Sequence, residues 1–153
     1  MQDERKDSTQ DTLEHIGKVQ DRIQEVCNNL TVRAVRHDLS KLVEPEKSGF
    51  DVLSAQLSTL VYGSAEYRAA LEAGKDTIAH HYSVNTHHPE HYPDGVGGMS
   101  LLDVVEMLCD WKAASERTKQ GSIAQSLAHN KERWHISDEL ASILANTVKE
   151  LGW

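Results

Sequence analysis

The chain has 153 residues, 39% of them hydrophobic and 26% charged, a balance typical of one soluble globular domain with a substantial core. Its formal net charge is −8 and it contains no run of Lys or Arg. This charge argues against a protein that holds polymeric DNA or RNA, which needs a basic face for the phosphates. No apolar run approaches the roughly 18 residues of a membrane-spanning helix.

The N-terminus and the cysteines favour a cytoplasmic protein. The polar start MQDERKDSTQD lacks the apolar segment of a secretory signal. Cys27 and Cys109 lie far apart in apolar surroundings, without CxxC spacing. We therefore expect two buried free thiols in a reducing compartment.

The first half of the chain has helical periodicity. From Thr12 onward, apolar residues recur at steps of three and four, which predicts an amphipathic helix: Leu13, Ile16, Val19, Ile23, Val26 and Leu30. The pattern then predicts a short helix over 31–42 that ends near Pro45, and another over 47–60. Ser64 is placed to cap a helix that continues to residue 84, with Gly74 as a weak point inside it.

An irregular stretch over 85–98 interrupts this periodicity and is rich in Pro and Gly. Ser100 and Asp103 have the spacing of a capping box that opens the next helix, which runs to about residue 118. Gly121 ends that segment, a further helix follows over 122–134, and Ser137 caps the last one. The sequence thus predicts a compact all-α bundle over 12–153 with one long His-rich loop, after a flexible N-terminus over 1–11.

Three features could carry chemistry outside the loop. His37 and Asp38 are adjacent, and both can reach one point only near a helix end, where imidazole and carboxylate would suit a divalent metal. The alternative is a solvated helix end in which Asp38 pairs with Lys41. His15 lies at the margin of the apolar stripe. It is either a metal ligand or a half-buried histidine that is hydrogen-bonded to a neighbour. Asp103, Glu106 and Asp110 line one face of a helix, which either faces an internal site or is solvated.

The stretch AHHYSVNTHHPEH, residues 79–91, contains five of the nine histidines, at positions 80, 81, 87, 88 and 91. Any one of them could be an ordinary surface or packing residue. Metal or phosphate chemistry is the better explanation for the whole cluster, because imidazole is both a common metal ligand and a base near neutral pH.

The order of these residues resembles the HD-domain metal-dependent phosphohydrolases. A lone His on a first helix, a His-Asp pair, further histidines and a later helical Asp match His15, His37-Asp38 and Asp110 in order. The layout HDLSK, HHYxxNxHHPEHY and EMxCDWxAAS is similar to that of short uncharacterised HD-like proteins of phages and bacteria. This resemblance covers about residues 12–150 and favours Asp110 over Asp103 as the closing ligand, and a location in the host cytoplasm if the gene belongs to a phage.

The resemblance implies one or two divalent ions (Mn, Fe, Co, Ni, Mg or Zn) that activate a water and neutralise a phosphate ester. The implied ligands are His15, His37, Asp38 and Asp110 for one ion, with Asp38 bridging to a second ion on His81 and His88. Lys41 and Arg33 are the expected phosphate contacts and His87 a further substrate contact. Glu106 would orient a ligand or the water, so that Asp38, Glu106 and Lys41 form the expected catalytic set.

The implied activity is hydrolysis of a small phosphate ester, with a nucleotide or deoxynucleotide as the first candidate, and no membrane or polymeric nucleic acid as partner. One alternative is a non-catalytic metal-stabilised module that binds a nucleotide or a protein. Another is an HD-fold di-iron oxygenase. The apolar C-terminal helix, which ends at Leu151-Gly152-Trp153, offers a surface for a homo-oligomer.

Overall fold

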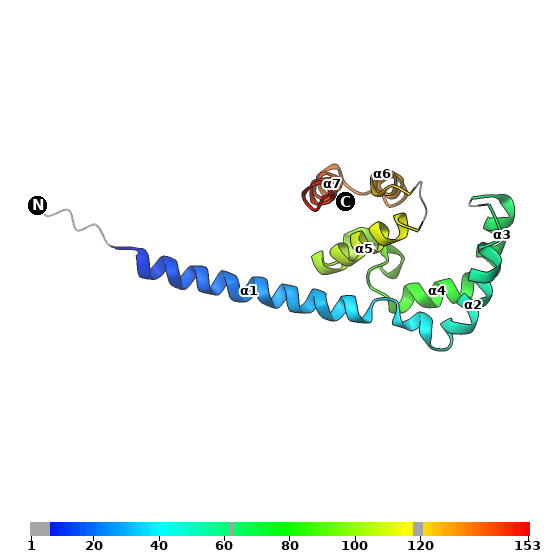
Figure 1. Ribbon diagram of the computed structural model, residues 1–153, viewed down its shortest axis with the longest axis horizontal. Helices are drawn as coiled ribbons and strands as arrows, with labels where there is room; N and C mark the ends of the chain where they lie inside the picture. The colour runs from blue at the N-terminus through cyan, green and yellow to red at the C-terminus, as the bar shows by residue number, and fades with distance from the viewer. Residues whose placement is uncertain (1–6, 62, 118–120) are drawn as a thin grey trace, which may run out of the picture. The chain divides into compact units, whose positions relative to one another are not determined.

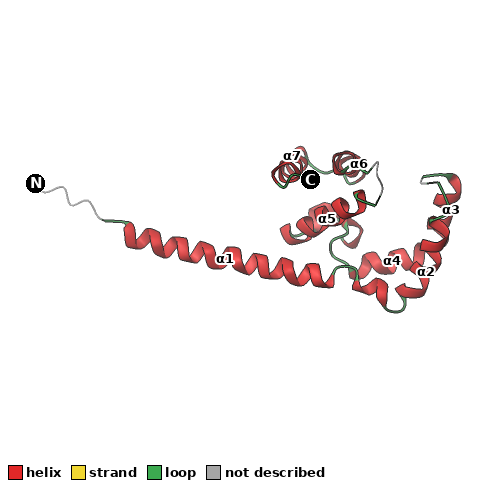
Figure 2. Ribbon diagram, in the orientation of Figure 1, coloured by secondary structure: helices red, strands yellow, loops and turns green. Residues whose placement is uncertain are grey.

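The computed structural model describes residues 7–61, 63–117 and 121–153, which form two compact units. Residues up to Val35 form the first unit and Arg36–Trp153 the second. The described residues contain helices and loops without a strand (Figure 2), so the all-α prediction is confirmed. None of the described helices combines the length and the apolar content needed to cross a membrane. The predicted boundary between residues 11 and 12 stays a prediction.

The N-terminal unit is one long helix, α1 (Thr9–Arg36), drawn from blue to cyan in Figure 1. The predicted separate helix over 31–42 is therefore wrong. Nothing in the sequence between Leu30 and Val35 breaks helical geometry, and α1 simply continues to Arg36. The chain then turns at His37 and Asp38 and forms a short 3-10 helix, η1 (Leu39–Leu42).

The second unit continues with three short helices and a loop. These are α2 (Glu46–Leu57), α3 (Ala65–Ala73) and α4 (Lys75–Val84). The predicted helix from 64 to 84 is thus divided at Gly74, where a Cβ atom would lie 3.2 Å from both terminal methyl carbons of buried Leu53. The absence of a side chain lets the chain change direction directly over α2. The loop that follows contains two 3-10 turns, η2 (Pro89–His91) and η3 (Gly95–Gly98).

Close packing of α2 on α4 brings two buried polar residues together. A Cβ atom at Gly49 would overlap the side chain of Thr77, so the two helices approach more closely there than a larger residue would allow. Glu46 on α2 and His81 on α4 are both buried, with exposed fractions of 0% and 2%. This pair becomes part of the candidate site.

The remaining helices are α5 (Leu101–Ser115), α6 (Ile123–Arg133) and α7 (Asp138–Glu150). They share one apolar core, composed of Val104, Met107, Leu108, Ile123, Leu144 and Val148. Ser122 and Ser137 cap α6 and α7. The predicted end of α5 near residue 118 lies outside the described residues.

Both cysteines are free but exposed, so the prediction of buried thiols is wrong. Cys27 is on α1, none of whose described residues is buried. Cys109 follows the core residue Leu108 on α5, and the step of about 100° between neighbours turns it away from that core.

The predicted capping box is present at the start of α5. The Ser100 hydroxyl accepts a hydrogen bond from the Asp103 backbone amide, and Asp103 Oδ2 accepts bonds from the Ser100 amide and hydroxyl at 2.8 and 2.6 Å. The Tyr92 hydroxyl donates to the same oxygen at 3.0 Å. Asp103 is therefore a buried capping residue that also fixes the end of the His-rich loop.

We predict that Ser100→Ala lowers the free energy of unfolding by about 1 kcal/mol, because the first turn of α5 loses its cap. Urea denaturation followed by circular dichroism measures this loss. Ser142→Ala is the matched control, since Ser142 is exposed within α7 and its hydroxyl donates to the carbonyl oxygen of Asp138 in the same helix. Equal stability of the two variants would contradict the assignment.

Candidate metal centre

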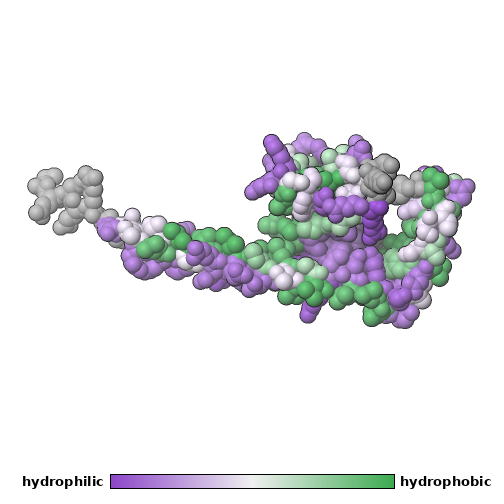
Figure 3. Space-filling view, in the orientation of Figure 1, coloured by the Kyte–Doolittle hydropathy of each residue, from purple (hydrophilic) through white to green (hydrophobic). Residues whose placement is uncertain are grey.

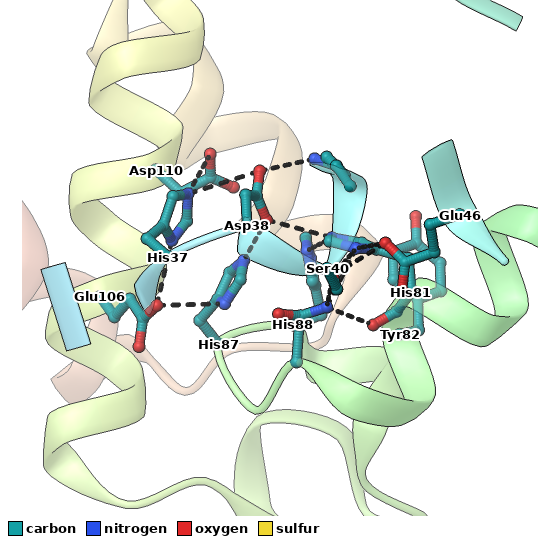
Figure 4. Close-up of polar contacts among 12 residues, drawn as sticks. His37, Asp38, Ser40, Glu46, His81, Tyr82, His87, His88, Glu106 and Asp110 are labelled. Atoms are coloured by element: carbon teal, nitrogen blue, oxygen red, sulfur yellow. Dashed lines mark hydrogen bonds and ion pairs between the residues drawn. The ribbon is translucent and has the colours of Figure 1, made fainter. Parts of the chain in front are cut away.

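The site begins at the turn that ends α1. Asp38 has a positive φ of 58°, the left-handed conformation that Asp and Asn tolerate better than most residues. On a regular helix, neighbouring side chains diverge by about 100°. The left-handed turn removes that divergence, so His37 and Asp38 contribute to the same cluster (Figure 4).

Three imidazole rings converge on one oxygen of the Asp38 carboxylate. His81 Nε2 lies 2.9 Å from His88 Nε2 and 3.2 Å from Asp38 Oδ1, and His87 Nε2 lies 3.6 Å from the same oxygen. Neighbouring ligands of an ion with bonds of about 2.1 Å are separated by roughly 3–3.4 Å. Together with His87, these residues form a group whose ligand atoms all lie within 4.8 Å of one another, as required to hold a metal ion.

Two buried atoms of this group have no hydrogen-bond partner among the described residues, Asp38 Oδ1 and His87 Nε2. A buried polar atom left unpaired costs about 1–3 kcal/mol, so such atoms are rare in native proteins. Here both atoms face the same centre, and both are of a type that binds divalent metals. A cation at this centre would satisfy them together.

Glu46 sets the orientation of His81. This fully buried carboxylate accepts hydrogen bonds from His81 Nδ1 at 2.9 Å, His80 Nδ1 at 2.9 Å and the Ser40 hydroxyl at 2.8 Å. Because His81 donates through Nδ1, its Nε2 lone pair is directed to the centre. Burial acts to raise the pKa of Glu46, but the bonds from Ser40, His80 and His81 outweigh it and lower that pKa.

The other two histidines are kept neutral. Burial, followed by the neighbouring His87 and His81, lowers the pKa of His88 to about 3. Burial and the adjacent His37 likewise lower the pKa of His87. Neutral imidazole is the form that binds a metal, so these surroundings prepare both side chains as ligands.

A second group lies on the other side of Asp38. Glu106 Oε1 is 3.0 Å from His37 Nδ1 and 3.3 Å from His87 Nδ1. His37 Nε2 is then 3.6 Å from Asp38 Oδ2 and 3.7 Å from Asp110 Oδ1. The hydrogen bond to Asp110 raises the pKa of His37 to about 9, despite partial burial. Asp38 thus presents one oxygen to each group (Figure 4), which suits a bridging carboxylate.

Lys41 stands at the edge of the cluster. Its Nζ donates to Asp38 Oδ2 at 2.6 Å and lies 5.2 Å from the centre of the Phe50 ring. Burial acts to raise the pKa of Asp38, but the close contact with His81 and the hydrogen bond from Lys41 hold that pKa well below its usual range. The predicted Asp38–Lys41 pair is present, yet it belongs to the cluster and not to a solvated helix end.

A pocket of about 450 Å³ adjoins the cluster, and its lining combines polar, aromatic and apolar side chains. His81, His88, Lys41 and Arg117 contribute polar and cationic groups, and Phe50 and Tyr82 contribute aromatic rings. The polar residues Asp51 and Ser54 of α2 also line it, together with apolar side chains from α2, α3 and α4: Leu53, Leu57, Leu71 and Ile78.

The structure brings together most of the predicted site residues: His37, Asp38, Lys41, His81, His87, His88, Glu106 and Asp110. His87, expected to contact substrate, lies among the possible ligands. Asp110 reaches the cluster, whereas the alternative Asp103 caps α5. His15 and Arg33 lie on α1 in the N-terminal unit, and their roles as ligand and phosphate contact stay predictions.

The remaining histidines of the 79–91 stretch have supporting roles. His80 donates to Glu46, and His91 Nδ1 donates to the carbonyl oxygen of Tyr82 at 2.9 Å, which ties the loop to α4. Sequence reasoning missed Glu46, Ser40 and Asn85. The Asn85 amide donates to Ser40 Oγ at 2.9 Å and to the carbonyl oxygen of His81 at 2.8 Å. No spacing rule links these three residues: Ser40 and Glu46 belong to different helices six residues apart, and Asn85 follows Ser40 by 45 residues.

Comparison with known proteins gives a family without an assigned activity. No curated protein and no solved structure matches the chain. The resemblance to HD-domain phosphohydrolases therefore stays a prediction. One family model matches residues 4–150, almost the whole sequence. The chain belongs to that family, described as a family of unknown function (DUF5662).

Proposed function

We propose that this protein is a metal-dependent phosphohydrolase that acts on a small phosphate ester, with a nucleotide or deoxynucleotide as the first candidate. The observation that carries the proposal is the pair of unpartnered buried atoms, Asp38 Oδ1 and His87 Nε2, at the centre of a three-histidine group. The nitrogen-rich donor set favours Fe, Co, Ni or Zn over Mg and Mn, which prefer oxygen ligands.

A divalent ion held here would lower the pKa of a bound water and offset negative charge on phosphoryl oxygens. The protein's own residues supply orientation and charge around that chemistry. Glu46 accepts the Nδ1–H of His81, and Glu106 Oε1 lies 3.3 Å from His87 Nδ1, so both carboxylates hold the Nδ1 side of a ring and leave its Nε2 directed to the centre. Glu106 therefore acts as a positioning residue.

The adjoining pocket supports a small ester as the substrate. Its volume of about 450 Å³ is within the range of small-molecule sites, about 300–1,000 Å³. Lys41 and Arg117 can pair with phosphate oxygens next to the cluster, while Phe50 and Tyr82 offer aromatic surface for a planar or apolar leaving group. The formal net charge of −8 disfavours a polymeric nucleic acid.

The first prediction of the proposed function is stoichiometric metal binding. Purified protein should contain at least one bound transition metal per chain by elemental analysis, and chelation should lower its melting temperature because the two unpaired atoms lose their partner. His88→Ala should lose that metal. His129→Ala, at an exposed histidine on α6, is the matched control and should retain it. A metal-free wild type that no added ion stabilises would exclude the centre.

The second prediction concerns turnover. Metal-loaded protein should release phosphate from at least one member of a panel of nucleoside mono- and triphosphates and simple phosphate esters. Asp38→Asn should reduce this activity by at least about 100-fold, since even outer-shell changes at metal sites cost about 10–100-fold. Asn is the better substitution than Ala, because it tolerates the positive φ of 58° at this position.

The outcomes of that assay separate the proposal from its alternatives. Stoichiometric metal without release of phosphate from any ester would favour a non-catalytic metal-stabilised binding module. Oxygen consumption by the iron-loaded protein would favour the di-iron oxygenase. Full activity of Asp38→Asn would refute the assigned role of this carboxylate.

A third prediction tests Glu46 as a positioning residue. Glu46→Gln should weaken metal affinity about 10–100-fold, because His81 loses its charged acceptor. Saturating metal should restore most of kcat, since Glu46 does not face the centre. Glu132→Gln, at an exposed residue of α6, is the control with unchanged affinity. A loss of kcat that excess metal does not restore would assign Glu46 a direct role instead.

A further inference from the structure

The N-terminal unit presents an apolar seam with no described residue buried. Apolar side chains of α1 have exposed fractions of 41–59%: Leu13, Ile16, Val19, Ile23 and Val26. Monomeric soluble proteins rarely expose a continuous apolar strip of this kind. A helix that buries none of its apolar face also lacks the packing that stabilises most protein helices. The seam therefore needs a partner.

The spacing of the seam identifies a helix as that partner. Leu13 lies on the flank of the seam, and the other residues alternate at steps of three and four, an average of 3.5, which is the repeat of a left-handed coiled coil. The eight positions are Thr9, Thr12, Ile16, Val19, Ile23, Val26, Leu30 and Arg33. β-Branched residues fill the four central positions, and the polar residues fall at the two ends.

The distribution of charge along α1 favours a second copy of α1 as the partner helix, in antiparallel orientation. Residues 9–21 contain three acidic and one basic side chain, whereas residues 22–36 contain three basic and one acidic. Two copies of α1 in antiparallel orientation would place each acidic half beside a basic half. A parallel pair would oppose like halves and would place the two Arg33 side chains against each other in the seam.

We infer that α1 forms an antiparallel coiled coil with α1 of a second copy of this chain. The two seams overlap fully when their midpoints are aligned. In that register Ile16 of one copy packs against Val26 of the other, and Val19 packs against Ile23. The same register places Leu13 near Cys27 of the other copy, on one flank of the seam. This interface is independent of the proposed function, since it uses none of the cluster residues on η1, α2, α4 or α5.

Sedimentation velocity of the full chain over a wide concentration range tests the inference. The wild type should be a dimer at micromolar concentration. Ile23→Glu should raise the dissociation constant by roughly 100-fold or more, because two carboxylates per dimer would enter an apolar seam. Val32→Glu is the matched control, nine residues further along and on the opposite side of the helix, with an exposed fraction of 51%. It should leave the dissociation constant unchanged.

Cross-linking tests the orientation. In a Cys109→Ser background, Leu13→Cys paired with the native Cys27 should give a covalent dimer with a short bis-maleimide reagent. Residues 13 and 27 are about 21 Å apart within one helix, so a short link between them must join two chains. Glu14→Cys, on the outer face, should not cross-link to Cys27.

Two results would overturn the inference. One is a wild type that stays monomeric at every concentration; if Ile23→Glu then also lowered the melting temperature, α1 would pack on its own chain. The other is a dimer that Ile23→Glu and Val32→Glu leave equally intact, which would place the interface elsewhere, as on the C-terminal helix.

Discussion

The candidate site depends on the left-handed turn at Asp38. A helix that continued past Arg36 would separate His37 from Asp38, and the carboxylate could serve one group of ligands at most. The positive φ instead gives Asp38 a position from which Oδ1 lies 3.2 Å from His81 Nε2 while Oδ2 lies 3.6 Å from His37 Nε2. The turn is thus the constraint that connects the end of α1 with the histidines of α4 and its loop.

Two buried or half-buried carboxylates then determine how the rings face. Glu46 accepts Nδ1–H groups from His80 and His81, and Glu106 Oε1 lies 3.0 Å from His37 Nδ1 and 3.3 Å from His87 Nδ1. Each arrangement leaves the Nε2 atoms of His81 and His87 directed inward. The close approach of α2 and α4 at Gly49 brings Glu46 within reach of His81, so helix packing and ligand orientation are parts of one arrangement.

The sequence specified local features better than tertiary ones. The Ser100–Asp103 capping box followed from its spacing alone, because its partners lie within one helical turn. The predicted helix over 31–42 ends six residues beyond Arg36, where α1 ends, since Asp38 in a left-handed conformation carries no sequence signal comparable to Gly or Pro. Glu46 could not be found, because its role depends on His81 from another helix. Cys27 and Cys109 are exposed where burial was expected, since packing determines which side of a helix faces the core.

The charges of the cluster show why a cation suits it. Four carboxylates contribute to it, from Asp38, Glu46, Glu106 and Asp110, whereas burial keeps His87 and His88 neutral. The cationic groups of the cluster are Lys41 and His37, whose pKa is raised to about 9 by Asp110. Negative charge therefore exceeds positive charge in a region where low polarity strengthens repulsion. A divalent ion held by Asp38 Oδ1 and the histidine Nε2 atoms would balance this excess and would satisfy the two unpaired atoms at the same time.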